Sequence, residues 1–329
     1  MVAIGSARRV VFTARKGWAD RLRALGVVRL AFVLAFFVFY SLLVFWALIG
    51  GDDPYYQFRY EEVKIEQQQG GDLDILNDLV ATKKVKKIFL TYDPPSSSHW
   101  LGTDELGRDV LNRLAHGALA SLEMGFICLF SFLVAGIGFG ITAGYFEGRW
   151  RGLVLYFFSL VNTFPLLLLL LLSVIIIDGL VDDAQVRIYL LMLLLGLFSS
   201  PKLAELIRGR IASLKETAFV HAAVSLGLSP VQIIGKHILW YECRPLILVQ
   251  SAYMMGQAIL IETTLTYLKF GLEYPVVSWG LMLRTMASGI FTGQVQVVFV
   301  MAMIALSVFF FQYLAALLND LLATRHKGD

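Results

Sequence analysis

The sequence has little charge for its length. Only 16% of its 329 residues are Asp, Glu, Lys or Arg, whereas 57% are hydrophobic and the mean hydropathy is +0.69. A soluble domain of this size needs far more charge on its surface, so this composition excludes an ordinary soluble protein. The apolar residues also gather in long runs, which indicates a polytopic membrane protein.

Cysteines and catalytic motifs are scarce as well. Cys128 falls in a predicted span and Cys243 in a polar stretch, so we expect no disulfide between them. The sequence has no GxxxxGK[ST] phosphate loop, no nucleophile elbow and no HExxH motif. His221 and His237 lack supporting ligand spacing and predict no metal site. We therefore expect no catalytic residue, metal or cofactor, and uphill transport would need a partner or an ion gradient.

Six apolar stretches are long enough to cross a membrane. They cover about 29–49, 121–144, 153–177, 186–200, 245–268 and 294–318, of which the fourth is short. At a rise of 1.5 Å per residue, about 20 residues cross a hydrocarbon core of about 30 Å. Pro165 is expected to kink the third helix or to start part of it. The pattern predicts an all-α membrane protein with six transmembrane helices.

Basic residues fall on one side of this arrangement. They comprise the N-terminal tail, Arg149 and Arg151, the basic residues between Lys202 and Arg244, and Arg325 and Lys327. The opposite side carries Asp178, Asp182 and Asp183 against a single Arg187 in its short loop. Because cytoplasmic loops are enriched in Lys and Arg, both termini are predicted to be cytoplasmic.

The same arrangement predicts the domain organisation. We expect a basic cytoplasmic tail at 1–28, a first span at 29–49, a long extracytoplasmic loop or small subdomain at 50–120, a five-span core at 121–318 and a cytoplasmic tail at 319–329. Alternation of apolar and polar residues near Val63 and Val85 allows a strand or two in the long loop. The charged run from Asp104 to Asp109 is explained by salt bridges and helix capping.

The stretch from Lys202 to Arg244 is a polar, basic island between apolar spans. It contains helix formers and a central glycine, Gly227. Such a segment must lie in water on one face of the membrane, where it could dock a soluble partner.

Gly136, Gly140 and Gly144 are four residues apart in the second span. They line one helix face and let another helix approach closely, either within this chain or across a subunit interface.

Glu262 is a carboxylate inside the fifth span. An ionised group there costs a few kcal/mol, so it must face water or a partner. It is either a pathway or gating residue, or a carboxylate hydrogen-bonded to Thr263, Thr264 or another helix.

Four stretches together resemble a known family. They are His99-Trp100-Leu101-Gly102-Thr103-Asp104-Glu105-Leu106-Gly107-Arg108-Asp109-Val110-Leu111-Asn112-Arg113-Leu114, similar to HxLGTDxLGRDVLSRL; Ala143-Gly144-Tyr145-Phe146-Glu147-Gly148, similar to AGYFGG; the basic island, similar to the EAA loop; and Leu260 to Leu272 with Ser278-Trp279-Gly280, similar to LxETTLSFLGLG…SWG. The chain is identified as similar to C-type permease subunits of bacterial ABC importers for dipeptides, oligopeptides and nickel.

The resemblance implies a bacterial inner-membrane importer with a second permease subunit, two ATP-binding subunits and an extracytoplasmic solute-binding protein. It further implies a cytoplasmic coupling (EAA) helix between spans four and five that meets the ATPase. His221, Ala222, Ala223 and Gly227 match that motif, and Lys215 and Lys236 flank it. His221 replaces the glutamate of the motif, Trp240 its proline, and Lys269 a family glycine.

The sequence therefore predicts a permease subunit, and not an enzyme, that forms half of a peptide pathway in the lipid bilayer, with no nucleic acid as partner. Two alternatives remain at this point. The chain could be a permease for another small solute such as nickel, or a self-contained secondary carrier.

Overall fold

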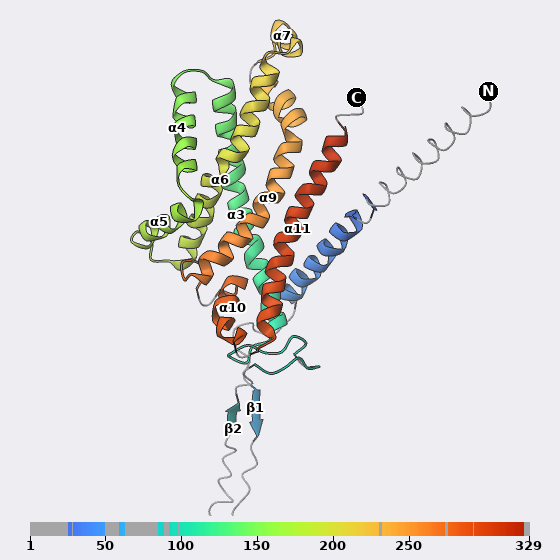
Figure 1. Ribbon diagram of the computed structural model, residues 1–329, viewed down its shortest axis with the longest axis vertical. Helices are drawn as coiled ribbons and strands as arrows, with labels where there is room; N and C mark the ends of the chain where they lie inside the picture. Colours follow the sequence, from blue (N-terminus) through green and yellow to red (C-terminus); the bar gives the residue numbers. More distant parts are fainter. Residues whose placement is uncertain are drawn as a thin grey trace, which may run out of the picture.

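The computed structural model describes residues 26–27, 29–49, 59–62, 85–88, 92–97, 99–229, 232–273, 276–291 and 293–325. The elements, in chain order, are an N-terminal helix (Arg29–Ile49), β1 (Arg59–Glu62), β2 (Val85–Ile88), α3 (Val110–Tyr145), α4 (Arg149–Thr163), α5 (Leu166–Asp178), α6 (Ala184–Lys215), α7 (Ala218–Ser225), the π-helical η2 (Ile233–Cys243), α9 (Arg244–Tyr267), α10 (Trp279–Met286), the 3₁₀ helix η3 (Ala287–Ile290) and α11 (Gln296–Arg325). Figure 1 shows the helices packed side by side as a bundle.

The bundle is an all-α membrane protein. Within the described residues, five helical segments have the length and hydropathy to cross a membrane: the N-terminal helix, α3, α6, the continuous run of η2 and α9, and α11. The pair α4 and α5 makes a sixth candidate when it is counted as one span. The predicted fold class is confirmed.

The third predicted span is broken. Helices α4 and α5 meet at an angle of 97°, and Pro165 stands between them. The residue before a proline is driven out of the α region, and Phe164 has φ −102° and ψ 141°. The stretch predicted as the third span is thus two helices, and the expected break at Pro165 is confirmed. Figure 1 shows α5 turned away from α4.

The fourth predicted span is longer than expected, because α6 continues past Pro201 to Lys215. Pro201 has no N–H to donate to the carbonyl oxygen of Leu197, four residues earlier. The hydroxyl of Ser200 donates to that oxygen instead, at 2.6 Å. This local substitute lets the helix run on into the basic island.

Helix α3 also begins before the predicted start at residue 121. Its N-cap is Asp109, whose carboxylate accepts from the backbone N–H of Asn112 at 2.8 Å. Just before it, the buried Asp104 carboxylate accepts from Arg108 Nε at 2.7 Å and pairs with an Arg113 guanidinium nitrogen at 3.0 Å. The expectation of salt bridges and capping in this run is confirmed, and the pairing allows an arginine inside the first turns.

Two short strands lie beyond one end of the bundle (Figure 1). β1 and β2 pair antiparallel, with Arg59 opposite Ile88 and Glu62 opposite Val85. The strand expected near Val85 is therefore present, whereas Val63 lies outside the described residues.

Candidate functional site

Helix α7 lies at one end of the bundle. Figure 1 shows it projecting beyond α6, at the same end as the C-terminal end of α11 and opposite to α10 and the strands. Its first turn begins with backbone bonds from Val220 and His221 to the carbonyl oxygen of Thr217, at 3.0 and 3.2 Å. Only Glu216 and Thr217 separate α7 from the end of α6.

One face of α7 packs on the bundle and the other is open. Ala223 is buried, with only 4% of its surface exposed, and joins the core cluster that includes Ile207 and Ile211 of α6. His221, Ala222 and Leu226 lie on the exposed side. Leu226 is 82% exposed. Ala223 therefore marks the side of α7 that faces the bundle.

Gly227 ends the helix in a conformation that other residues rarely adopt. Its φ is +80°, and a Cβ built on it would meet no atom within 4 Å. The next residue, Leu228, donates its N–H to the carbonyl oxygen of Ala223 at 3.1 Å. This is the six-to-one bond of a left-handed helix end. Backbone conformation, not space, selects glycine here.

Lys215 lies at the hinge between α6 and α7. Its Nζ lies 3.1 Å from Oε1 of Glu147 in the loop between α3 and α4, and 5.8 Å from the ring centre of Tyr145. It thereby ties the end of α6, from which α7 follows, to the neighbouring loop. Lys236 lies in η2, and its side chain falls outside the described residues.

A second ion pair lies at the same end of the bundle. A guanidinium nitrogen of Arg210 lies 2.5 Å from Oε2 of Glu242, linking α6 to η2. Trp240, which stands where the EAA loop of the similar permeases has a proline, is 61% exposed. Its ring lies 5.4 Å from the guanidinium carbon of Arg244.

Glu262 is fully buried at 0% exposure near the far end of α9. Its Oε1 accepts from the hydroxyl of Thr266 at 2.9 Å, and its Oε2 from that of Thr263 at 3.5 Å. The Thr266 hydroxyl also accepts from the backbone N–H of Leu272 at 3.1 Å. Glu262 therefore holds together the end of α9 and the segment that follows.

The three glycines of α3 face α6. A Cβ on Gly136 would come within 2.8 Å of the Leu203 side chain, and one on Gly140 within 2.8 Å of Ile207 Cβ. A Cβ on Gly144 would come within 3.0 Å of Ile211 Cβ. The close approach that the spacing predicted is thus made within this chain.

A polar cavity of about 380 Å³ lies between α6, α9 and α11. Its polar lining residues are Lys202, Gln250, Tyr253, Gln257 and Gln312. Three of them follow one face of α9, because positions 250, 253 and 257 are three and four residues apart. A second cavity of about 490 Å³ shares Leu260, Val308 and Gln312 with it and continues along α9 and α11.

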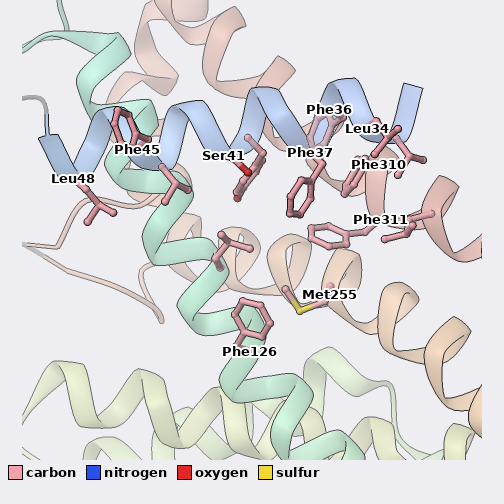
Figure 2. A pocket seen from close by; sticks show the side chains of 15 residues that line it. Leu34, Phe36, Phe37, Ser41, Phe45, Leu48, Phe126, Met255, Phe310 and Phe311 are labelled. Atoms are coloured by element: carbon pink, nitrogen blue, oxygen red, sulfur yellow. The ribbon is translucent and has the colours of Figure 1, made fainter. Parts of the chain in front are cut away.

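A larger cavity of about 660 Å³ lies between the N-terminal helix and parts of α3, α9 and α11 (Figure 2). Figure 2 shows Phe37 and Phe45 of that helix lining it, with Phe126 of α3 and Phe311 of α11 across the gap. Its lining is almost wholly apolar, so it offers few hydrogen bonds to a polar solute.

Comparison with known proteins identifies the family. The profile of the family described as "Binding-protein-dependent transport system inner membrane component" matches residues 136–327. This chain belongs to that family. As a member, it is a membrane component of a transport system, and the matched segment contains α7, Glu262 and every polar residue of the cavity between α6, α9 and α11.

Named relatives agree with this assignment. Over 190 residues the chain is 35% identical to the dipeptide transport system permease protein DppC of Alkalihalophilus pseudofirmus, covering 57% of this chain and 60% of that protein, less than two thirds of its length. It is 30% identical over 234 residues to the glutathione transport system permease protein GsiD of Pectobacterium atrosepticum, covering 71% of this chain and 75% of the relative. The Escherichia coli GsiD is 31% identical over the same length.

Sequence reasoning placed α7 but missed the polar cavity. The missed signal was the glutamine spacing in two otherwise apolar spans, Gln250 and Gln257 in α9 and Gln312 in α11. The sequence places Lys202 in the basic island, because the fourth predicted span ends at residue 200, whereas α6 continues to Lys215.

Proposed function

We propose that this chain is the permease subunit of an ATP-driven importer for peptides. It forms half of the translocation pathway beside a second permease subunit. Two ATP-binding subunits hydrolyse ATP, and an extracytoplasmic solute-binding protein delivers the solute. The family description supports binding-protein dependence, and the relatives named for dipeptide and glutathione transport support peptides as the solute class.

The end that carries α7 is the cytoplasmic end in this proposal. Arg149, Arg151 and Lys215 lie at the helix ends nearest α7, whereas Asp178 and Asp183 lie at the opposite end. Cytoplasmic ends of membrane helices are enriched in Lys and Arg. Both termini are then cytoplasmic, and the long loop at 50–120 is extracytoplasmic in a bacterial inner membrane.

The observation that carries the proposal is the exposed face of α7. His221, Ala222 and Leu226 face away from the bundle, and a leucine that is 82% exposed in water is a natural contact for a groove on a soluble partner. Ala223 of α7 joins the buried core cluster, and Lys215 ties the end of α6, just before α7, to Glu147. Movement of a bound ATPase is thereby passed to α6 and, through Gly136, Gly140 and Gly144, to α3.

The pathway runs along the polar cavity between α6, α9 and α11. Polar side chains in a span normally face water or a protein partner because lipid cannot satisfy them. We assign the remaining wall to the second permease subunit. Glu262, being fully buried and bonded to Thr266, acts as an anchor for the outer end of α9 and does not line the path.

Leu226→Glu tests the coupling role. In detergent-solubilised complex purified through this chain, the variant should lose the ATP-binding subunits or retain at most about a tenth of them. Leu180→Glu is the matched control, since Leu180 is 78% exposed but follows α5 at the opposite end. Equal retention of the ATP-binding subunits in both variants would overturn the assignment of α7.

A further inference from the structure

The polar cavity between α6, α9 and α11 carries one cation. Lys202 lines it together with Gln250, Gln257 and Gln312, and none of its lining residues is acidic. Glu205, one turn further along α6, does not line the cavity. Among the described residues, the ion pairs do not include Lys202.

The charge of this lysine favours an anion beside it. Lys202 is exposed, whereas its neighbours Pro201 and Leu203 are buried, so its ammonium is open to water or to an anion. A lysine along a membrane helix is stabilised when its ammonium meets water or an anionic group.

The three glutamines complement the lysine. Each amide carries a carbonyl acceptor and an NH₂ donor, which is the hydrogen-bonding pattern of a peptide group. No hydrogen bond to another described residue involves the side chains of Gln250, Gln257 or Gln312, so their amides are available to a solute. A volume of about 380 Å³ lies within the range of small-molecule sites.

We propose that this cavity is a transient binding site for peptides with a free carboxylate. The Lys202 ammonium pairs with the carboxylate, and Gln250, Gln257 and Gln312 bond to the peptide groups behind it. This inference rests on the proposed function and adds to it a preference of the permease itself, separate from that of the binding protein.

Thiol labelling measures the charge of the site directly. The complex carrying Gln257→Cys is treated with a methanethiosulfonate reagent bearing a sulfonate and, separately, with one bearing a trimethylammonium group. The native Cys128 and Cys243 are both buried and add little background. Phe291→Cys, which is 92% exposed and lies outside the cavity, supplies the reference ratio of the two rates.

The expected result is a sulfonate-to-ammonium rate ratio at position 257 about tenfold above the reference. Adding Lys202→Gln should return the ratio to the reference, and adding Lys202→Arg should preserve it. Alanyl-alanine should protect the cysteine from labelling, and its C-terminal amide should protect it much less. Equal ratios with and without Lys202, or equal protection by acid and amide, would overturn the inference.

Two further outcomes separate the possible failures. Position 257 could stay unlabelled by both water-soluble reagents until anionic lipid is left out of the preparation. That result would assign Lys202 to a lipid headgroup and overturn the peptide site. If the wild-type complex takes up alanyl-alanine while the Gln257→Cys complex shows no charge preference in labelling, this inference fails and the proposed function stands. If it takes up no peptide at all, the proposed function fails too.

Discussion

The indole Nε1 of Trp279 donates a hydrogen bond to the backbone carbonyl oxygen of Leu114 at 2.9 Å, across 165 residues of sequence. Trp279 is fully buried, and a Cβ on Gly117 would come within 2.5 Å of its Cδ1 atom. Two of the stretches that resemble the permease family thus meet at one point, at the start of α3 and of α10. The glycine at 117 leaves room for the tryptophan.

The conformation of Gly227 gives the first prediction. Gly227→Ala should loosen α7, because a left-handed conformation costs a residue with a Cβ about 1–2 kcal/mol. Hydrogen exchange at the α7 amides should speed up about tenfold, and ATP-dependent uptake should fall. Gly227→Asn should be milder, since asparagine tolerates this region.

Gly235→Ala is the control for that prediction. Its Cβ would also meet no atom within 4 Å, but no positive φ applies there. If the α7 amides exchanged hydrogen at the same rate in the Gly227→Ala and Gly235→Ala variants, the left-handed conformation of Gly227 would not be what fixes α7.

The contact of α3 with α6 gives the second prediction. Gly140→Ala forces a Cβ to within 2.8 Å of Ile207 and should destabilise the solubilised protein by about 1–3 kcal/mol. Gly138→Ala, on the same helix, meets nothing within 4 Å and should be neutral or slightly stabilising. Thermal unfolding midpoints measure both. A loss of stability in Gly138→Ala as large as in Gly140→Ala would count against close packing as the cause.

The buried cluster before α3 gives the third prediction. Asp104→Asn removes the carboxylate that Arg108 and Arg113 share at 2.7 and 3.0 Å, and should cost about 3–5 kcal/mol. Asp183→Asn is the matched control, since Asp183 is an exposed N-cap of α6 and asparagine caps as well as aspartate. Comparable midpoints for the two variants would show that the cluster contributes little.

Glu105 gives a prediction on pH. Its burial, and the Asp104 carboxylate beside it, raise the pKa of Glu105 above its ordinary value. Because folding raises this pKa, ionised Glu105 costs stability at every pH above its unfolded pKa of about 4.3, and the full cost is reached above the folded pKa.

Glu105→Gln should therefore be more stable than the wild type at neutral pH. The difference should shrink as the pH falls through the folded pKa and disappear below the unfolded one. Unfolding midpoints of the two proteins, compared from about pH 8 to pH 4, check this. A difference that did not change with pH would contradict it.

Two prolines show what sequence reasoning could and could not settle. Pro165 and Pro201 both lie in apolar stretches, yet the chain turns by 97° at the first and continues as one helix through the second. At Pro201, the Ser200 hydroxyl donates to the carbonyl oxygen of Leu197 that the proline leaves without its N–H donor, which helps the helix to continue. Hydropathy alone does not register such a bond.

For the candidate site, the sequence predicted the position of α7 but not the polar cavity. The position of α7 followed from polarity and a motif of small residues, since a polar segment between spans must leave the membrane. The cavity depends on Lys202, Gln257 and Gln312 meeting from α6, α9 and α11, and residues so far apart come together only in the fold. For Glu262, hydropathy left two interpretations open, and the bond to Thr266 is the observation that favours an anchor.

Uptake of alanyl-alanine by proteoliposomes tests the central claim most directly. Vesicles contain the whole complex, with or without internal ATP, with or without the solute-binding protein outside, and with the wild-type chain or Leu226→Glu. The account predicts uptake only when ATP, binding protein and wild-type α7 are all present. Uptake by this chain alone, driven by an ion gradient with no ATPase in the vesicle, would contradict it and establish a secondary carrier.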